Sequence, residues 1–285
     1  MQQSMHNRLS RLRSNIMLFV CTGFATLIIA VLLLITGYLV SVGIHSLNLA
    51  FFTQVPIPVG MEGAPGGMKN GVLGTLMLIC MASVVGIPLG MLCGIYLSEY
   101  DSDTWLNGPV RFISDVLAGV PSIVVGILGY ELLVVPMQSY SGYAGAAALA
   151  FIMIPIVCRT TEEMLRLVPN SYREASIGLG ATKASTILHV IVPSATGSIV
   201  TGVMLAVARV AGETAPLLFT AFSSRFVETN PARPFPSLTK LIFDYATGIY
   251  PEQQRLARAG ILVLIGLIFV LNLTVRYFTR SRHRG

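Results

Sequence analysis

Apolar residues in this chain gather in long blocks, which are separated by shorter polar stretches or by stretches rich in glycine and proline. The blocks cover residues 16–40, 71–97, 110–136, 142–158, 194–222 and 259–277. An α-helix rises about 1.5 Å per residue, so a block of about 25 residues extends roughly 37 Å, enough to cross the hydrocarbon core of a bilayer. The pattern predicts an all-α polytopic membrane protein with about six transmembrane helices.

The blocks divide the chain into a membrane core and two basic ends. Residues 1–15 are predicted to form a basic cytoplasmic tail, residues 16–40 the first span, and residues 41–70 an external loop. Residues 71–277 then form the core, and residues 278–285 form a second basic cytoplasmic tail. The first block is longer than the apolar region of a signal peptide, so we expect it to stay in the protein as a span.

The segment Pro169–Pro193 interrupts the apolar pattern with charged residues and is too polar to cross a membrane. Ser171–Glu174 has the S-x-x-E spacing of a capping box, which predicts a short helix that starts near Ser171. That helix should end around Gly178 and Gly180, because glycine adopts left-handed backbone at little cost. A second apolar run begins at Ile187 and ends with the segment, so we expect a short helical knob on the membrane surface.

Composition supports the membrane assignment and narrows the class of partner. Hydrophobic residues make up 54% of the chain and charged residues 11%, whereas soluble domains average about a quarter charged. The net charge of +6 comes from lysine and arginine beside the predicted spans, so it does not indicate a nucleic-acid partner. Basic residues are densest on the side that holds both termini and the polar segment, and the positive-inside rule puts that side in the cytoplasm.

The chain itself lacks the residue patterns of an enzyme. No lysine follows a glycine, so the phosphate-binding sequence G-x-x-x-x-G-K-[ST] of an ATPase is absent. The four histidines are scattered through tails and predicted interfaces, which argues against a metal site or a catalytic cluster. We expect no catalytic residues, no bound metal and no cofactor on this chain, and we expect ATP and Mg²⁺ to bind to a partner.

Two charges lie four residues apart in the fifth apolar block. Arg209 and Glu213 are predicted to share one face of a membrane helix, where each costs at least about 2.5–3.5 kcal/mol. One interpretation is a self-neutralising pair that serves packing. The other is a cationic site on a solvated pathway, in which the guanidinium binds an oxyanion through two parallel hydrogen bonds and Glu213 tunes or gates it.

Two weaker signals lie in the third and fourth blocks. Arg159, at the cytoplasmic end of the fourth, is either an anchor at the membrane surface or a charge on the inner pathway. Asp115 is interpreted as a helix-end carboxylate. The run Leu117–Val124 combines glycine, proline and serine, and such a run either kinks a helix or frees backbone groups to line a cavity.

The polar segment resembles the loop that couples the permeases of ATP-binding-cassette (ABC) importers to their ATPase. The positions that match in residue type and spacing are Glu174, Ala175, Gly180 and Pro193, and three further positions carry small or conservative replacements. The resemblance implies that residues 169–193 are a coupling loop, whose short helix sits in a groove of an ATPase subunit. An ordinary amphipathic connector is the alternative.

Several stretches together resemble the PstA-type permeases of the bacterial phosphate-uptake ABC transporter. They are LAGVPSIVVG at 117–126, RTTEEML at 159–165, the coupling loop, and ARVAGETAPLLFTA at 208–221. The resemblance implies the type I ABC importer permease fold in a bacterial inner membrane, and a role for Arg159, Arg209 and Glu213 in phosphate movement. It also implies a PstC-type sister permease, two ATPase subunits and an external phosphate-binding protein.

One half of a phosphate-importing pathway is therefore the function that we expect. A permease for another oxyanion, such as sulfate or molybdate, would share the coupling loop and stays an alternative. A secondary transporter driven by an ion gradient would need no coupling loop, and its transport would survive ATP depletion.

Overall fold

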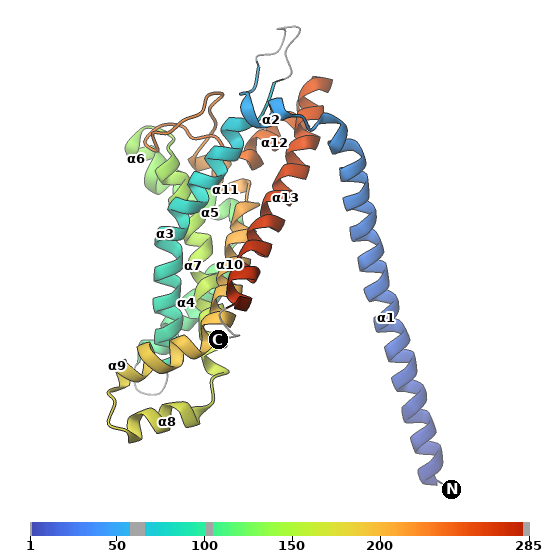
Figure 1. Cartoon of the computed structure of the whole chain (residues 1–285), viewed down its shortest axis with the longest axis vertical. Coiled ribbons are helices and arrows are strands. Elements are labelled where there is room, and N and C mark those ends of the chain that lie inside the picture. The colour runs from blue at the N-terminus through green and yellow to red at the C-terminus, as the bar shows by residue number, and fades with distance from the viewer. Residues whose placement is uncertain (1, 58–65, 101–104, 282–285) are drawn as a thin grey trace.

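The computed structural model describes residues 2–57, 66–100 and 105–281, and within these ranges every regular element is a helix (Figure 1). The prediction of an all-α membrane protein is confirmed. Parts of three predicted regions lie outside the described residues, namely residue 1 of the N-terminal basic tail, 58–65 of the external loop and 282–285 of the C-terminal basic tail.

Long helices form the frame of the molecule. Among the described residues, five helices are long and apolar enough to span a membrane, and a bent pair makes a sixth crossing when it is counted as one span. The frame consists of α1 (Gln2–Gly43), α3 (Lys69–Glu99), the bent pair α4 (Asn107–Gly119) and α5 (Ser122–Gly129), α7 (Gly142–Arg166), α10 (Val192–Ala211) and α13 (Pro251–Ser281).

Short helices lie at the two ends of this frame. At the end drawn uppermost in Figure 1 are η1 (Ile44–Ser46), α2 (Leu49–Thr53), α6 (Val135–Met137) and α12 (Leu238–Ala246). The π-helix η2 (Tyr130–Val134) joins α5 to α6, and α11 (Ala215–Thr220) follows α10. At the opposite end are α8 (Asn170–Gly178) and α9 (Lys183–Thr186), and the π-helix η3 (Ile187–Ile191) links α9 to α10.

Both ends of the chain point toward the end of the molecule that carries α8. In Figure 1 the N-terminal end of α1 and the C-terminal end of α13 run toward this end, while the α1–α2 connection lies at the opposite one. An even number of crossings produces this arrangement, as the prediction of about six spans requires.

Glycines let the central helices α3 and α7 approach closely. A Cβ added at Gly90 would lie 2.7 Å from the Val157 Cβ and 2.8 Å from the Ile154 carbonyl oxygen, and one at Gly94 would lie 2.5 Å from the Cys158 carbonyl oxygen. Small residues at a spacing of four form such contact surfaces in membranes, because van der Waals packing there depends on close backbone approach. The two helices therefore pack as one rigid pair at the centre of the molecule.

The first span stands apart from this centre. Figure 1 shows α1 leaning away from the other helices, and its apolar stretch is fully exposed along the chain's own surface. Contact is made at its end, where Gly43 packs against Leu262 of α13. The apolar side chains of α1 thus face outward and add nothing to the core.

The fifth span differs from its prediction at both ends. An apolar helix runs from Lys183 to Ala211, although Pro193 was expected to end the apolar run that begins at Ile187, and the span was expected to reach residue 222. Proline lacks an N–H and crowds the preceding turn. The π-helix η3 widens that turn, with the Val192 N–H donating to the Ile187 carbonyl, so the helix continues through Pro193.

Candidate functional site

A break in the third span borders a partly open cavity on the helix bundle. Helices α4 and α5 meet at an angle of 102°, and the chain between them is extended at Val120, which precedes Pro121. Proline disfavours helical backbone in the residue before it, so the sequence itself places the break. The surrounding cavity measures about 250 Å³, roughly the volume of eight liquid waters. Both interpretations of the run Leu117–Val124 apply, since the span bends there and residues 117–122 line the cavity.

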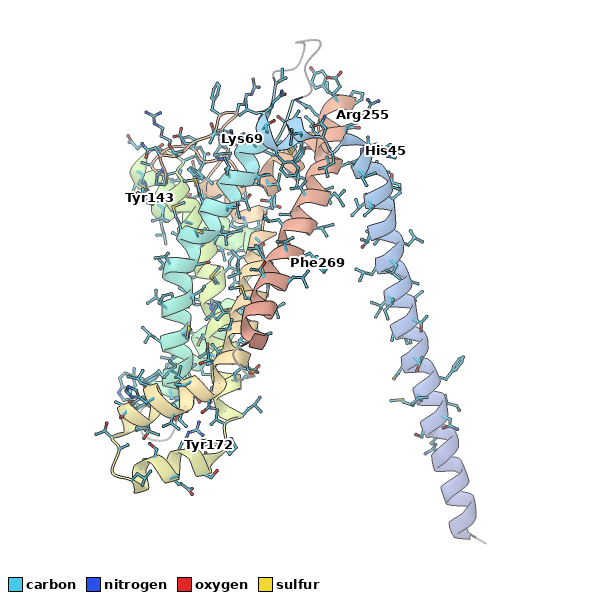
Figure 2. The ribbon with its side chains drawn as sticks, in the orientation of Figure 1. His45, Lys69, Tyr143, Tyr172, Arg255 and Phe269 are labelled. Carbon is cyan, nitrogen blue, oxygen red and sulfur yellow. The ribbon has the colours of Figure 1, made fainter. Side chains whose placement is uncertain are left out.

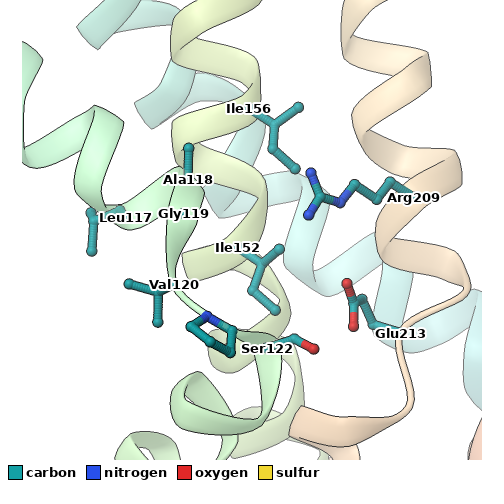
Figure 3. Close-up of a pocket in the computed structure, with 10 residues that line it drawn as sticks. Leu117, Ala118, Gly119, Val120, Ser122, Ile152, Ile156, Arg209 and Glu213 are labelled. Atoms are coloured by element: carbon teal, nitrogen blue, oxygen red, sulfur yellow. The ribbon is translucent and has the colours of Figure 1, made fainter.

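The cavity wall combines apolar side chains with two charged ones. Its lining comprises residues 117–122, Ile152 and Ile156 from α7, and Arg209 and Glu213. In Figure 3 the guanidinium of Arg209 points toward Ile156, and the carboxylate of Glu213 lies nearer to Ser122. The break, α7 and the end of α10 therefore bring one cation and one anion to the wall of the same small cavity.

Arg209 and Glu213 do not form the helical pair that the sequence suggests. Helix α10 ends at Ala211 and Gly212 caps it, so Glu213 lies beyond the helix and not on the face of Arg209. The Thr239 hydroxyl of α12 donates to the Glu213 carbonyl oxygen at 3.0 Å, which anchors this turn. Across the described residues, neither charged side chain has an ion pair or a hydrogen bond. The interpretation as a self-neutralising packing pair is therefore wrong in its geometry.

Arg159 lies outside the cavity lining but on the same side of α7. Residues at a spacing of three or four share a helix face, which places Arg159 one turn beyond Ile156. Its Nη1 lies 2.6 Å from the Asp115 Oδ1 of α4, and its Nε lies 2.9 Å from the Glu163 Oε1. Two carboxylates therefore bind this guanidinium, whereas Arg209 binds none in the part of the chain that the structure describes.

The coupling loop forms a helix, a glycine turn and a second helix, as expected. Glu174 and Ala175 are exposed on α8, and Gly180 adopts a left-handed backbone with a φ of +86°. The predicted capping box is wrong. Helix α8 begins at Asn170 after Pro169, Ser171 lies within it, and no side chain caps it. Proline at the preceding position fixes a backbone that already directs the chain into the helix, so a serine cap is not needed.

Sequence reasoning missed the ionic partners of this region. Asp115 was interpreted as a helix-end carboxylate, and Glu99 was not assigned a role, yet each binds an arginine of another helix. The partners are separated by 44 and 74 residues along the chain. No local spacing rule connects residues so far apart, so the sequence held no signal for these pairs.

Comparisons with known proteins agree on one family. Residues 86–284 match the family described as "Binding-protein-dependent transport system inner membrane component". The chain is 44% identical over 245 residues to the phosphate transport system permease protein PstA of Yersinia pestis, which covers 86% of this chain and 82% of that protein. It is 39% identical to the protein of the same name from Haemophilus influenzae, over 86% of each chain.

Solved structures show the same fold at lower sequence identity. An inward-facing structure of the MetNI methionine ABC transporter aligns with a TM-score of 0.59 at 18% identity, covering 74% of this chain and 92% of that one. A structure of an amino acid ABC transporter with histidines aligns with a TM-score of 0.54 at 20% identity, covering 75% of this chain and 91% of that one.

Proposed function

Because the chain belongs to the binding-protein-dependent transport inner membrane components, and among them to the PstA-type permeases, we propose that it forms half of the translocation pathway of an ATP-driven phosphate importer. Permeases of this family are multi-pass membrane proteins that work with an ATPase and a substrate-binding protein. Inorganic phosphate is the substrate on this proposal, and import into the cell is the direction.

The observation that carries the proposal is the unpaired guanidinium of Arg209 at the cavity. The exposed guanidinium of Arg209 lines the cavity and has no carboxylate partner among the described residues, so it keeps its attraction for an anion, and its planar group can donate to two oxygens of an oxyanion. A charge placed within a membrane span is costly unless it serves a pathway or a partner. Arg209 therefore supplies the positive potential that draws phosphate into the cavity formed at the α4–α5 break.

Glu213 and Arg159 take different roles along the same pathway. The carboxylate of Glu213 accepts a hydrogen bond from a protonated phosphate oxygen, which a sulfate ion lacks near neutral pH. Arg159 acts as a second cationic station, restrained by Asp115 and Glu163 until the anion competes for it. On this proposal the pathway distinguishes phosphate from sulfate by the proton that phosphate carries.

ATP hydrolysis takes place on a partner in this proposal. Glu174, Ala175 and the turn at Gly180 present α8 to a groove of the ATPase, which binds ATP and Mg²⁺. Pro193 lies in the following membrane helix and keeps that helix aligned with the loop. The full assembly has this chain, a PstC-type sister permease, two ATPase subunits and an external phosphate-binding protein.

Orientation follows from the distribution of basic residues. The end that carries α8 and both ends of the chain is cytoplasmic, because lysine and arginine are densest there. A membrane-impermeant thiol reagent applied to intact cells should label a cysteine placed at Asn230 and should not label one at Leu179. Labelling of Leu179 from outside would reverse the orientation.

Reconstitution tests the function itself. The complex is purified with its sister permease and ATPase, placed in proteoliposomes containing ATP, and supplied with the external binding protein. We expect accumulation of phosphate that stops without ATP and persists when ion gradients are collapsed. Accumulation that follows an ion gradient would support a secondary transporter, and equal accumulation of sulfate or molybdate would support the other oxyanion permease.

A further inference from the structure

Helix α8 is held to the rest of the molecule without burying an apolar face. None of its residues is buried, and Figure 1 shows it standing off from the end of the bundle. Its Tyr172, labelled in Figure 2, is 52% exposed. Since hydrophobic burial normally fixes a short helix in place, the position of α8 must depend on polar contacts.

One side chain of α8 supplies most of these contacts. Arg173 forms a two-pronged ion pair with Glu99, the last residue of α3, with Nε 3.0 Å from Oε2 and Nη2 2.6 Å from Oε1. Its Nη1 also donates to the Val168 carbonyl at 2.8 Å, and its Nη2 to the Leu165 carbonyl at 3.1 Å. A single guanidinium thus joins α8 to the end of α3 and to the end of α7.

The surroundings make this contact strong and geometrically defined. The side chain of Glu99 is 5% exposed and that of Arg173 is 21% exposed, so solvent screens the pair little. Hydrogen bonds to Glu99 raise the pKa of the Arg173 guanidinium above its ordinary value. A second polar contact joins Ser176 of α8 to Thr186 of α9 at 2.9 Å, and it reaches only the neighbouring part of the same loop.

We propose that Arg173, through Glu99, is the positioning residue that makes α3 and α7 move with α8. The inference rests on the proposed function, in which α8 docks on the ATPase. The pair α3–α7 is packed rigidly at Gly90 and Gly94, so a displacement applied at its end is carried along its length.

Further ion pairs continue this connection toward the cavity. On α7, Glu162 binds Arg111 of α4 at 2.8 Å, and Arg159 binds Asp115 of α4 at 2.6 Å. Helix α4 ends at the break that lines the cavity. A movement of α8 therefore has a continuous set of contacts, from Arg173 through α3 and α7 to α4, by which it reshapes the anion cavity.

The experiment compares Arg173→Met with Arg255→Met in the assembled, reconstituted complex. Arg255 is an exposed arginine of α13, so its variant controls for the loss of one positive charge. Two rates are measured for each complex: basal ATP hydrolysis, and hydrolysis with phosphate-loaded binding protein. We expect Arg173→Met to keep basal hydrolysis and to lose the stimulation by about 5- to 150-fold, the range of ordinary coupling energies. Arg173→Lys keeps the positive charge but loses the planar guanidinium that binds both carboxylate oxygens, so it should retain more stimulation than Arg173→Met.

A double variant separates positioning from mere stability. Arg173→Met with Glu99→Leu removes both charges, so no buried charge is left unpaired and the thermal stability of the complex should return. Stimulation should stay lost, because the two-pronged ion pair that joins Arg173 to Glu99 of α3 is absent. Recovery of stimulation together with stability would overturn the inference, as would wild-type stimulation in Arg173→Met. Absence of stimulation in the wild-type complex would instead refute the proposed function, so the two failures are distinguishable.

Discussion

Adding one methyl group to Gly180 should uncouple transport from ATP hydrolysis, whereas adding it two residues earlier should not. Gly180 has a φ of +86°, and a Cβ built there would meet no atom within 4 Å. The cost of Gly180→Ala is therefore conformational, about 1–2 kcal/mol for an L-residue in left-handed backbone. Gly178 is the last residue of α8 and has equally open space, so Gly178→Ala should stabilise the helix by about 0.5–1 kcal/mol.

The affected contacts are the hydrogen bonds that close the end of α8. The Gly180 N–H donates to the Ile177 carbonyl at 2.9 Å, and the Ala181 N–H donates to the Ser176 carbonyl at 3.2 Å. A loss of 1–2 kcal/mol changes the opening equilibrium by about 5- to 30-fold. Hydrogen–deuterium exchange of residues 179–181 should accelerate by that factor in Gly180→Ala and should slow or stay unchanged in Gly178→Ala.

Uptake of phosphate per ATP hydrolysed should fall in the Gly180 variant alone, because on the proposed function the ATPase docks on α8, whose C-terminal end opens in that variant. Equal exchange rates in the two alanine variants would refute the backbone argument. Faster exchange with normal coupling in Gly180→Ala would show that the order of this turn is not required for coupling.

Three other changes test the packing and the cavity. Gly90→Leu should cost about 1–3 kcal/mol or more and lower the yield of assembled complex, while Gly37→Leu on the open α1 should not; equal yields would refute close α3–α7 packing. Asp115→Asn should tighten phosphate binding to the purified complex by about two- to fivefold, because an exposed ion pair restrains Arg159; unchanged binding in calorimetry would argue against that restraint. Glu213→Gln should reduce the preference for phosphate over sulfate by about tenfold or more, and an unchanged ratio in competition binding would remove Glu213 from selectivity.

The sequence predicts the membrane topology because hydropathy acts locally. Each span needs about 20 apolar residues in succession, and blocks of that length are visible without knowledge of their neighbours. The break beside Pro121 is predictable for the same reason, since proline restricts the residue before it. The left-handed turn at Gly180 is predictable in the same way, because glycine is the residue that adopts a positive φ most readily.

The details that the sequence did not predict depend on competing local options or on distant partners. Pro193 was expected to end the apolar run that begins at Ile187, but the π-helix η3 just before it lets the helix continue. Ser171 has the spacing of a cap, yet Pro169 starts the helix first. Arg209 and Glu213 fit a helical spacing, and the helix ends between them at Gly212. The role of Arg173 requires Glu99, which only the packing of α3 brings to it.

The central claim is that Arg209 attracts a translocating phosphate ion, and uptake by the double variant Arg209→Met with Glu213→Leu tests it most directly. Radiolabelled phosphate uptake is measured in proteoliposomes that contain the assembled complex, ATP and the binding protein, with wild type and Arg209→Lys alongside. The double change leaves neither charge behind in the span, and since no ion pair joins these two side chains among the described residues, none is lost. We predict an assembled complex without uptake, and partial uptake in Arg209→Lys, which keeps the charge and loses the fork. Uptake at the wild-type rate in the double variant would contradict the claim.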